Sequence, residues 1–209
     1  MRKDFIAAIK THQAAFGLQL SEETIQRLAD YYDLVIEHNP LLHLVGPCSP
    51  EEFAIRHILE SLTLLEHLPA NAKFADVGAG AGLPSVPCLL VREDLTALLI
   101  ESKLKKAKFL TEAIARLGLM RRARIVNRQF EEADHVDCKY VTCRALDGFT
   151  RKLPRLIRWS ISSHLLLFGG ENLDDALHLL NVVFTKRLIP LSERRFLFVI
   201  LWETEPGKM

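Results

Sequence analysis

The sequence predicts an α/β fold, a mostly parallel sheet with helices on both faces, preceded by a small helical unit. Beyond residue 70, short apolar strand patterns alternate with amphipathic helical patterns, which is typical of such sheets. The first third instead spaces its apolar residues at helical intervals and has no strand pattern. A turn over Pro69–Lys73 separates the two parts. We therefore expect an N-terminal helical unit over residues 1–69 and a sheet domain over residues 70–209.

Three helices are expected in the N-terminal unit. Apolar residues recur at near-helical spacing over Phe5–Phe16. Ser21 is suited to cap a second helix, which we expect Asn39-Pro40 to end. Ser49-Pro50 combines a capping serine with a proline at the first helical position, and two acidic residues follow in the first turn. A third helix is therefore expected to begin there.

The sheet domain is expected to supply six strands. These are Phe74–Val77, Ala97–Ile100, Ala123–Val126, Tyr140–Cys143, Leu165–Phe168 and Phe196–Leu201. The helices expected between them include Lys105–Leu117, Arg151–Trp159 and Leu173–Phe184. In parallel sheets of this kind, ligands bind at the carboxyl ends of the strands. Candidate site residues are therefore expected at those ends.

Composition narrows the class of protein. The 209 residues are 49% hydrophobic, enough for one sizeable core with a small accessory unit. The formal net charge is +1, so nucleic-acid binding would require a local basic patch. The four cysteines have neither a CxxC spacing nor histidines at zinc-finger spacing, which favours free thiols in a reducing cytosol and no metal site. Without a signal sequence or an apolar run long enough to span a membrane, we expect a soluble cytoplasmic protein.

The glycine-rich run Asp76–Pro84 is the most informative motif. Three glycines at alternate positions follow an apolar strand and an acid, which predicts a tight turn whose backbone lies close to a ligand. A dinucleotide fingerprint needs Gly-x-Gly-x-x-Gly, and Leu83 occupies the position of its third glycine. The spacing thus favours S-adenosylmethionine and disfavours an NAD-dependent oxidoreductase. The candidate cofactor contacts in this run are Asp76, Gly78, Gly80, Gly82 and Leu83.

Two charged residues follow strands at the same predicted edge of the sheet. Glu101 ends the second strand about 20 residues past the glycines, where an acid accepts hydrogen bonds from both ribose hydroxyls of a nucleoside cofactor. Arg144 follows the fourth strand, where we expect it to contact the cofactor or the target nucleotide and to be the catalytic residue, by positioning the RNA or offsetting charge. The alternative is an ordinary salt-bridging arginine. RNA cytosine-C5 methyltransferases use a cysteine nucleophile within a Thr-Cys pair, partnered by a Pro-Cys pair on another strand end. A nucleophilic Cys143 is disfavoured, because the only Pro-Cys pair here, Pro87-Cys88, falls inside a predicted helix.

A basic helix face follows Arg144. Arg151, Arg155 and Arg158 recur at helical spacing and Lys152 lies beside them. With Trp159 nearby, we expect this face to hold an RNA backbone and stack a base, although solvation is the usual reason for a charged face. Among the histidines, His57 lies on the helix that leads into the sheet domain, and we expect it to have a structural and not a catalytic role.

Together these features resemble one known family, the bacterial small-subunit ribosomal RNA guanine-N7 methyltransferases, also called glucose-inhibited division protein B. The resemblance extends from about Tyr32 to Leu201. It rests on Asn39–Leu44, Arg56-His57, Glu60–Leu62, Asp76–Pro84 with Pro87, Glu101-Ser102, Cys143-Arg144-Ala145 and Glu193-Arg194-Arg195.

The resemblance implies a Rossmann-like class I methyltransferase sheet with a small N-terminal helical unit. It implies methyl transfer from S-adenosylmethionine to guanine N7 of 16S ribosomal RNA, with the RNA or the assembling 30S subunit as partner. Separately, we expect a monomer. By position, it places Gly78, Leu83, Gln129 and Phe130 against the cofactor, with Arg144 near it. Guanine N7 carries a lone pair and no proton, so catalysis would consist mostly of alignment.

The sequence also departs from the family pattern. His43 and Val45 replace an asparagine and a threonine, Glu60 an aspartate, Phe130 a glutamate and Gly169 a lysine. These departures motivate an alternative: a divergent member that acts as a non-catalytic S-adenosylmethionine-binding or ribosome-binding module.

Overall fold

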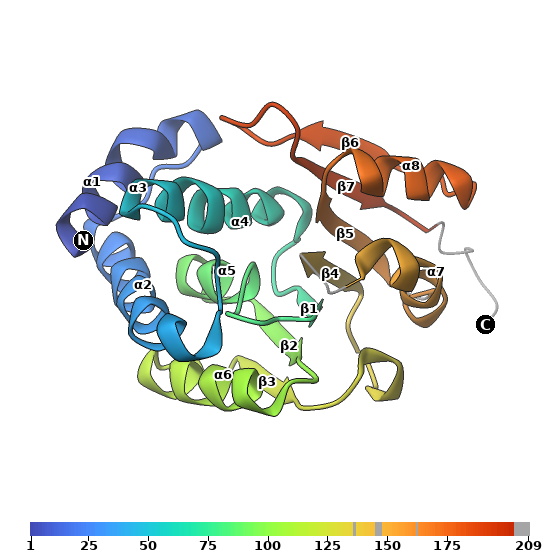
Figure 1. Ribbon diagram of the computed structural model, residues 1–209, viewed down its shortest axis with the longest axis horizontal. Coiled ribbons are helices and arrows are strands. Elements are labelled where there is room, and N and C mark those ends of the chain that lie inside the picture. Colours follow the sequence, from blue (N-terminus) through green and yellow to red (C-terminus); the bar gives the residue numbers. More distant parts are fainter. Residues whose placement is uncertain (136, 145–147, 162, 203–209) are drawn as a thin grey trace.

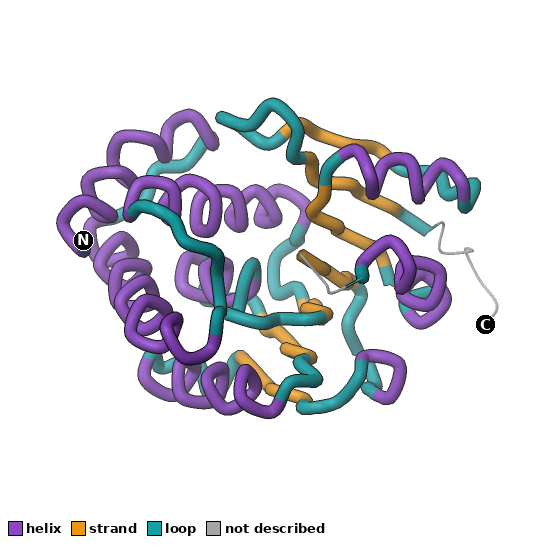
Figure 2. Tube along the Cα trace, viewed as in Figure 1, coloured by secondary structure: helices purple, strands orange, loops and turns teal. Residues whose placement is uncertain are grey.

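The protein is built around one mixed sheet (Figures 1 and 2). The computed structural model describes residues 1–135, 137–144, 148–161 and 163–202. Within them the sheet has the strand order β3-β2-β1-β4-β5-β7-β6. The strands are β1 (Lys73–Val77), β2 (Thr96–Ile100), β3 (Ala123–Val126), β4 (Tyr140–Arg144), β5 (His164–Gly169), β6 (Thr185–Leu188) and β7 (Phe196–Ile200). β1 to β5 run parallel, and β7 is antiparallel to both β5 and β6.

The predicted strands were found, but the sequence missed β6. All four residues of β6, Thr185–Leu188, are exposed, so this edge strand lacks the apolar alternation that marks a strand. The helix predicted over Leu173–Phe184 is also too long. Helix α8 ends at Leu179, and Phe184 lies in the connection to β6, where its ring packs against Phe198.

The helices lie against the sheet, and the N-terminal helices group together on one side of the molecule (Figure 1). They are α1 (Arg2–His12), α2 (Glu22–Leu42), α3 (Pro50–Phe53), the π-helical η2 (Ala54–Leu59), α4 (Glu60–Leu62), α5 (Ser85–Val91), α6 (Leu104–Arg116), α7 (Phe149–Trp159) and α8 (Glu171–Leu179). Short 3₁₀ turns lie at Gln13–Phe16, Thr63–His67 and Phe130–Glu132. No helix of the described segments is long and apolar enough to cross a membrane.

Ser21 and Ser49 cap the starts of α2 and α3, as the sequence predicted. Ser21 accepts from the Thr24 amide, and Ser49 forms a reciprocal capping box with Glu52. The predicted stop at Asn39-Pro40 was wrong, because α2 continues to Leu42. Near the end of a helix, Pro40 removes one backbone donor without breaking the remaining turn.

Helices cover both faces of the sheet, as the alternation predicted. On β1, Phe74 faces a core shared with α5, α6 and the N-terminal helices, whereas Ala75 and Val77 face a second core under α7 and α8. Neighbouring residues of a strand point to opposite faces, so one short apolar strand serves both cores.

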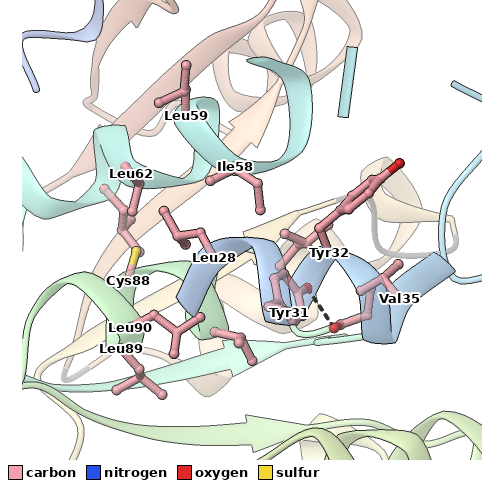
Figure 3. Packing of buried hydrophobic residues seen from close by; sticks show 14 of the residues in the cluster. Leu28, Tyr31, Tyr32, Val35, Ile58, Leu59, Leu62, Cys88, Leu89 and Leu90 are labelled. Atoms are coloured by element: carbon pink, nitrogen blue, oxygen red, sulfur yellow. Dashed lines mark hydrogen bonds between the residues drawn. The ribbon is translucent and has the colours of Figure 1, made fainter. Parts of the chain in front are cut away.

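The N-terminal helices pack directly against α5 and the glycine loop. Leu28, Ile58, Leu62, Cys88 and Leu89 belong to one buried cluster, where α2, the η2–α4 segment and α5 meet (Figure 3). The buried Tyr31 hydroxyl donates to the Ala81 carbonyl at 2.8 Å. We propose that residues 1–69 form a helical unit docked on the sheet domain of residues 70–209.

Candidate active site

The glycine loop turns the chain from β1 into α5. Gly78 and Gly80 have φ angles of 74° and 55°, in the left-handed region that glycine adopts without strain. Gly82, with φ 95°, has a packing reason as well, because a Cβ there would lie 2.6 Å from Val86 Cγ2. The loop therefore needs two glycines for its path and a third for its fit against α5.

A cavity of about 270 Å³ opens where the carboxyl ends of β1, β2 and β4 meet. Of the residues predicted to bind ligands, it is lined by Gly78, Gly80, Leu83, Glu101, Arg144 and Lys152. The N-terminal unit adds Leu44, Val45, Gly46 and His57 to the wall. The cavity thus lies between the helical unit and the sheet edge.

Glu101 lies in the cavity wall with its carboxylate held by the backbone. Its side chain is nearly buried; Oε2 accepts from the Gly80 amide at 3.0 Å and Oε1 from the Lys103 amide at 2.7 Å. Each oxygen has a further lone pair that can accept a ribose hydroxyl. Sequence reasoning missed Asn127, whose amide donates to the Glu101 and Ser102 carbonyls and secures this strand end.

Asp76 lies beneath the glycine loop. Its Oδ2 accepts from the Ser85 hydroxyl at 2.6 Å, whereas Oδ1 has no partner among the described residues. Complete burial raises the pKa of Asp76 to about 7, and the Ser85 hydrogen bond opposes this shift. Neither Asp76 nor Gly82 lines the cavity, so direct contact of either with a cofactor stays a prediction.

Arg144 reaches the cavity from the end of β4 and is anchored on the N-terminal unit. Its Nη2 donates to the Arg56 carbonyl at 2.5 Å and lies 3.5 Å from Glu60 Oε1, and its Nη1 donates to Ser61 Oγ at 3.3 Å. Burial lowers the pKa of Arg144, and Glu60 opposes that shift. Glu60 also accepts from Arg195 Nε at 2.9 Å.

His57 belongs to the cavity wall, in the π-helical stretch Ala54–Leu59. Burial, with the positive charges of Arg144, Arg56 and Arg195, lowers the pKa of His57 to about 3. The imidazole is therefore neutral at physiological pH, and its Nδ1 has no partner among the described residues. The position next to Arg144 could not be read from the sequence, which indicated only a structural histidine.

The residues after β3 lie outside the cavity. Phe130 is buried and meets Trp159 edge to face, while Trp159 also packs on His135 and donates to the Ala133 carbonyl at 3.0 Å. The structure therefore does not support Trp159 as a stacking platform for a base. Neither Gln129 nor Phe130 lines the cavity, so their adenine contacts stay predictions.

The basic face of α7 begins at the cavity. Lys152 lines it, and Arg151, Arg155 and Arg158 are exposed on the same helix. Arg155 lies 3.9 Å from Glu131, a contact that solvent weakens. Ala145, which follows Arg144 in the family motif, lies outside the described residues.

Neither metal ligation nor disulfide chemistry marks the described part of this edge. No group of three or more His, Cys, Asp or Glu side chains arranged to hold a metal ion occurs among the described residues. Cys48, Cys88, Cys138 and Cys143 form no disulfide with one another, and Cys143 is buried within β4.

Comparisons with known proteins agree with this architecture. A family model described as rRNA small subunit methyltransferase G (GidB) matches residues 24–181. The chain is 35% identical over 157 residues to ribosomal RNA small subunit methyltransferase G of Neisseria meningitidis serogroup B, covering 75% of this chain and 72% of the relative. It is 38% identical over 148 residues to the protein of that name from Sorangium cellulosum, covering 69% and 60%.

Solved structures show the same fold at low sequence identity. The human methyltransferase 10 domain containing protein superposes with a TM-score of 0.54 at 11% identity, over 87% of this chain and 98% of that one. P. horikoshii TYW2 in complex with MeSAdo gives 0.53 at 14% identity, over 71% and 63%. With the strand order of the sheet, these likenesses show the Rossmann-like fold of class I methyltransferases.

Proposed function

The chain belongs to the rRNA small subunit methyltransferase G (GidB) family, and from this premise we propose that it methylates guanine N7 in 16S ribosomal RNA, with S-adenosylmethionine as donor. The observation that carries the proposal is the cavity at the carboxyl edge of the sheet. There the glycine loop, Glu101 and Arg144 meet across three adjacent strands.

The residues present fit this cofactor. Glu101 offers two carboxylate oxygens, already oriented by backbone amides, to ribose hydroxyls. Gly78 and Gly80 allow the close approach of a ligand to the backbone, and Leu83 gives the wall an apolar surface. When bound, S-adenosylmethionine supplies an electrophilic sulfonium methyl group.

The charges of the wall indicate how Arg144 is used. Guanine N7 becomes cationic as it is methylated, so a guanidinium facing that atom would raise the barrier. We therefore assign Arg144 to the carboxylate of the cofactor. His57 carries no charge at physiological pH and can lie near the developing cation without repelling it. Since N7 bears no proton, the protein contributes alignment and exclusion of water instead of a strong base.

The RNA side rests on α7. Lys152 joins the cavity to an exposed face formed by Arg151, Arg155 and Arg158, which suits the phosphates of a strand whose base enters the cavity. The proposed substrate is the small ribosomal subunit or its RNA, so we propose that the protein acts in the cytoplasm. We also propose that it acts as a monomer.

One observation favours a second candidate, the non-catalytic binding module. At Gly169, where the family has lysine, an added Cβ would lie 2.8 Å from Leu173 Cβ. A lysine side chain therefore does not fit at this position, which favours the loss of any contact that the family's lysine makes.

The deciding experiment is methyl transfer from labelled S-adenosylmethionine onto 30S subunits and bare 16S RNA from a strain that lacks the modification. We expect incorporation at one guanine N7, mapped by chemical cleavage at 7-methylguanine. Cofactor binding measured by calorimetry without any incorporation would support the binding module instead.

A further inference from the structure

We propose that Glu60 is the positioning residue for Arg144: its buried carboxylate, shared with Arg195, holds the Arg144 guanidinium at the cavity wall and thereby sets the affinity for the cofactor. The inference rests on the proposed function in one respect, that Arg144 faces the cofactor carboxylate.

Glu60 joins two arginines that are far apart in the sequence. Its side chain is 3% exposed, with Oε1 3.5 Å from Arg144 Nη2 and Oε2 2.9 Å from Arg195 Nε. Arg144 ends β4, whereas Arg195 immediately precedes β7. The Glu60 carboxylate therefore contacts both the end of β4, at the cavity, and the connection between β6 and β7.

The local helix geometry supports this anchor. Arg56 lies in the π-helical stretch Ala54–Leu59, and its carbonyl accepts a hydrogen bond from Arg144, outside that helix. The Arg56 carbonyl and the Ser61 hydroxyl take two further contacts from Arg144, at 2.5 and 3.3 Å. With Glu60 they confine the guanidinium from one side. Among the described residues, no hydrogen-bond partner is found for Arg144 Nε.

The charge of the cluster suits an anionic ligand. One carboxylate and two guanidiniums leave a net charge of +1. A buried charge is costly unless paired, so Glu60 is what allows Arg144 to remain there as a cation. Positioning and charge nevertheless predict opposite results when Glu60 is neutralised, which makes the inference testable.

The first test is Glu60→Gln, with S-adenosylmethionine binding measured by calorimetry. The amide offers one acceptor where two guanidiniums need two, so Arg144 loses its fixed position. We expect affinity about tenfold weaker, the effect of losing a well-placed hydrogen bond to a charged group. If Glu60 acted through its charge alone, removing a negative charge near the cofactor carboxylate would tighten binding instead.

Glu66→Gln is the matched control. Glu66 makes an ion pair with Arg187 that likewise joins the N-terminal unit to the β6–β7 hairpin, but both side chains are well exposed and away from the cavity. This variant should bind the cofactor like the unmodified protein. Glu60→Asp retains the carboxylate, and the two long arginines can follow it, so it should recover affinity to within about threefold.

A charge-balanced variant separates the effect of position from the effect of charge. It also avoids leaving Arg195 without its carboxylate partner, which could destabilise the fold. Glu60→Gln/Arg195→Gln retains the net charge of +1, since it removes one anion and one cation together. We expect it to fold, as judged by its thermal unfolding, and still to bind the cofactor more weakly than the unmodified protein, because a neutral amide holds the Arg144 guanidinium less firmly than a carboxylate does. In an Arg144→Ala background, Glu60→Gln should have no additional effect on affinity, because the two residues act as one unit.

Unchanged or tighter binding by Glu60→Gln, or unmodified affinity in the charge-balanced variant, would overturn the inference. So would additive effects of Glu60→Gln and Arg144→Ala. Because the readout is cofactor affinity, it is independent of methyl transfer to RNA. A protein that binds the cofactor but methylates no RNA would refute the proposed function and leave the Glu60 result interpretable.

Discussion

Asp76 is a residue whose protonation state changes when the chain folds. Its pKa is raised to about 7 in the folded protein from an ordinary value of 3.8. Between these values the unfolded chain is ionised while the folded chain holds a proton. The native state therefore loses stability as the pH rises from about 4 to about 7, by up to roughly 4 kcal/mol.

Asp76→Asn should remove that loss. Its free energy of unfolding relative to the unmodified protein should grow from about pH 4 to pH 7 and then level off. His57, with its lowered pKa, changes stability in the opposite direction but is present in both proteins and cancels in the difference. Urea unfolding across this pH range measures the effect. A pH-independent difference would mean that Asp76 is ionised in the fold.

Glu101 provides the second prediction at this scale. Glu101→Gln should weaken S-adenosylmethionine binding about tenfold, because an amide has one acceptor where the carboxylate has two. Calorimetry measures the change. Glu93→Gln is the control, since that side chain is 83% exposed and lies away from the cavity. Equal affinities of the two variants would show that Glu101 does not bind the ribose of the cofactor.

At the scale of elements, α7 is the helix that we propose to hold RNA. Replacing Arg151, Arg155 and Arg158 by glutamine should weaken binding to 16S RNA. It should also reduce the slope of log affinity against log salt by about 2 to 3, since each lost phosphate contact removes close to one unit. Affinity for the cofactor should not change, because these three side chains lie outside the cavity lining.

The control for α7 is a basic pair on a distant helix. Lys3 and Lys10 lie on α1, at the opposite end of the molecule from α7 (Figure 1). Lys3→Gln/Lys10→Gln should leave the salt dependence unchanged. Filter binding over a salt series measures both variants, and an equal loss of slope would indicate nonspecific attraction.

The same scale shows where sequence patterns succeed. The apolar strands β1, β2, β4 and β5 were predictable because burial on both faces demands a continuous apolar run. β6 has no such apolar run, because all of its residues are exposed. It forms a strand through its pairing with β7, which the sequence pattern does not reveal. The path of α2 beyond Pro40 depends on packing that local propensity does not contain.

For the whole molecule, the N-terminal helices and the sheet share a continuous core. Residues from Phe5 to Val199 belong to one buried cluster that crosses the proposed boundary at residue 69. A chain that begins at residue 70 would expose the faces of α5 and α6 that α2 covers. We expect that truncated chain to lack a cooperative unfolding transition.

The complete protein should instead unfold in one step. Trp159 and Trp202, its two tryptophans, both lie in the sheet domain, so their fluorescence reports on that part. Helical circular dichroism reports on both parts. Coincident urea transitions by the two probes are expected. Separate transitions would show that the helical unit is independently stable.

By itself the sequence determined the alternation of strands and helices, the glycine loop, the acid at Glu101 and the resemblance to one methyltransferase family. These are local features, because turn geometry and strand ends depend on neighbours along the chain. The tertiary structure alone decided that Glu60 joins Arg144 to Arg195, that His57 lies in the cavity wall, and that Phe130 and Trp159 pack away from it. Such contacts join residues up to 135 positions apart, and their chemistry depends on burial and charge that exist only after the chain has folded.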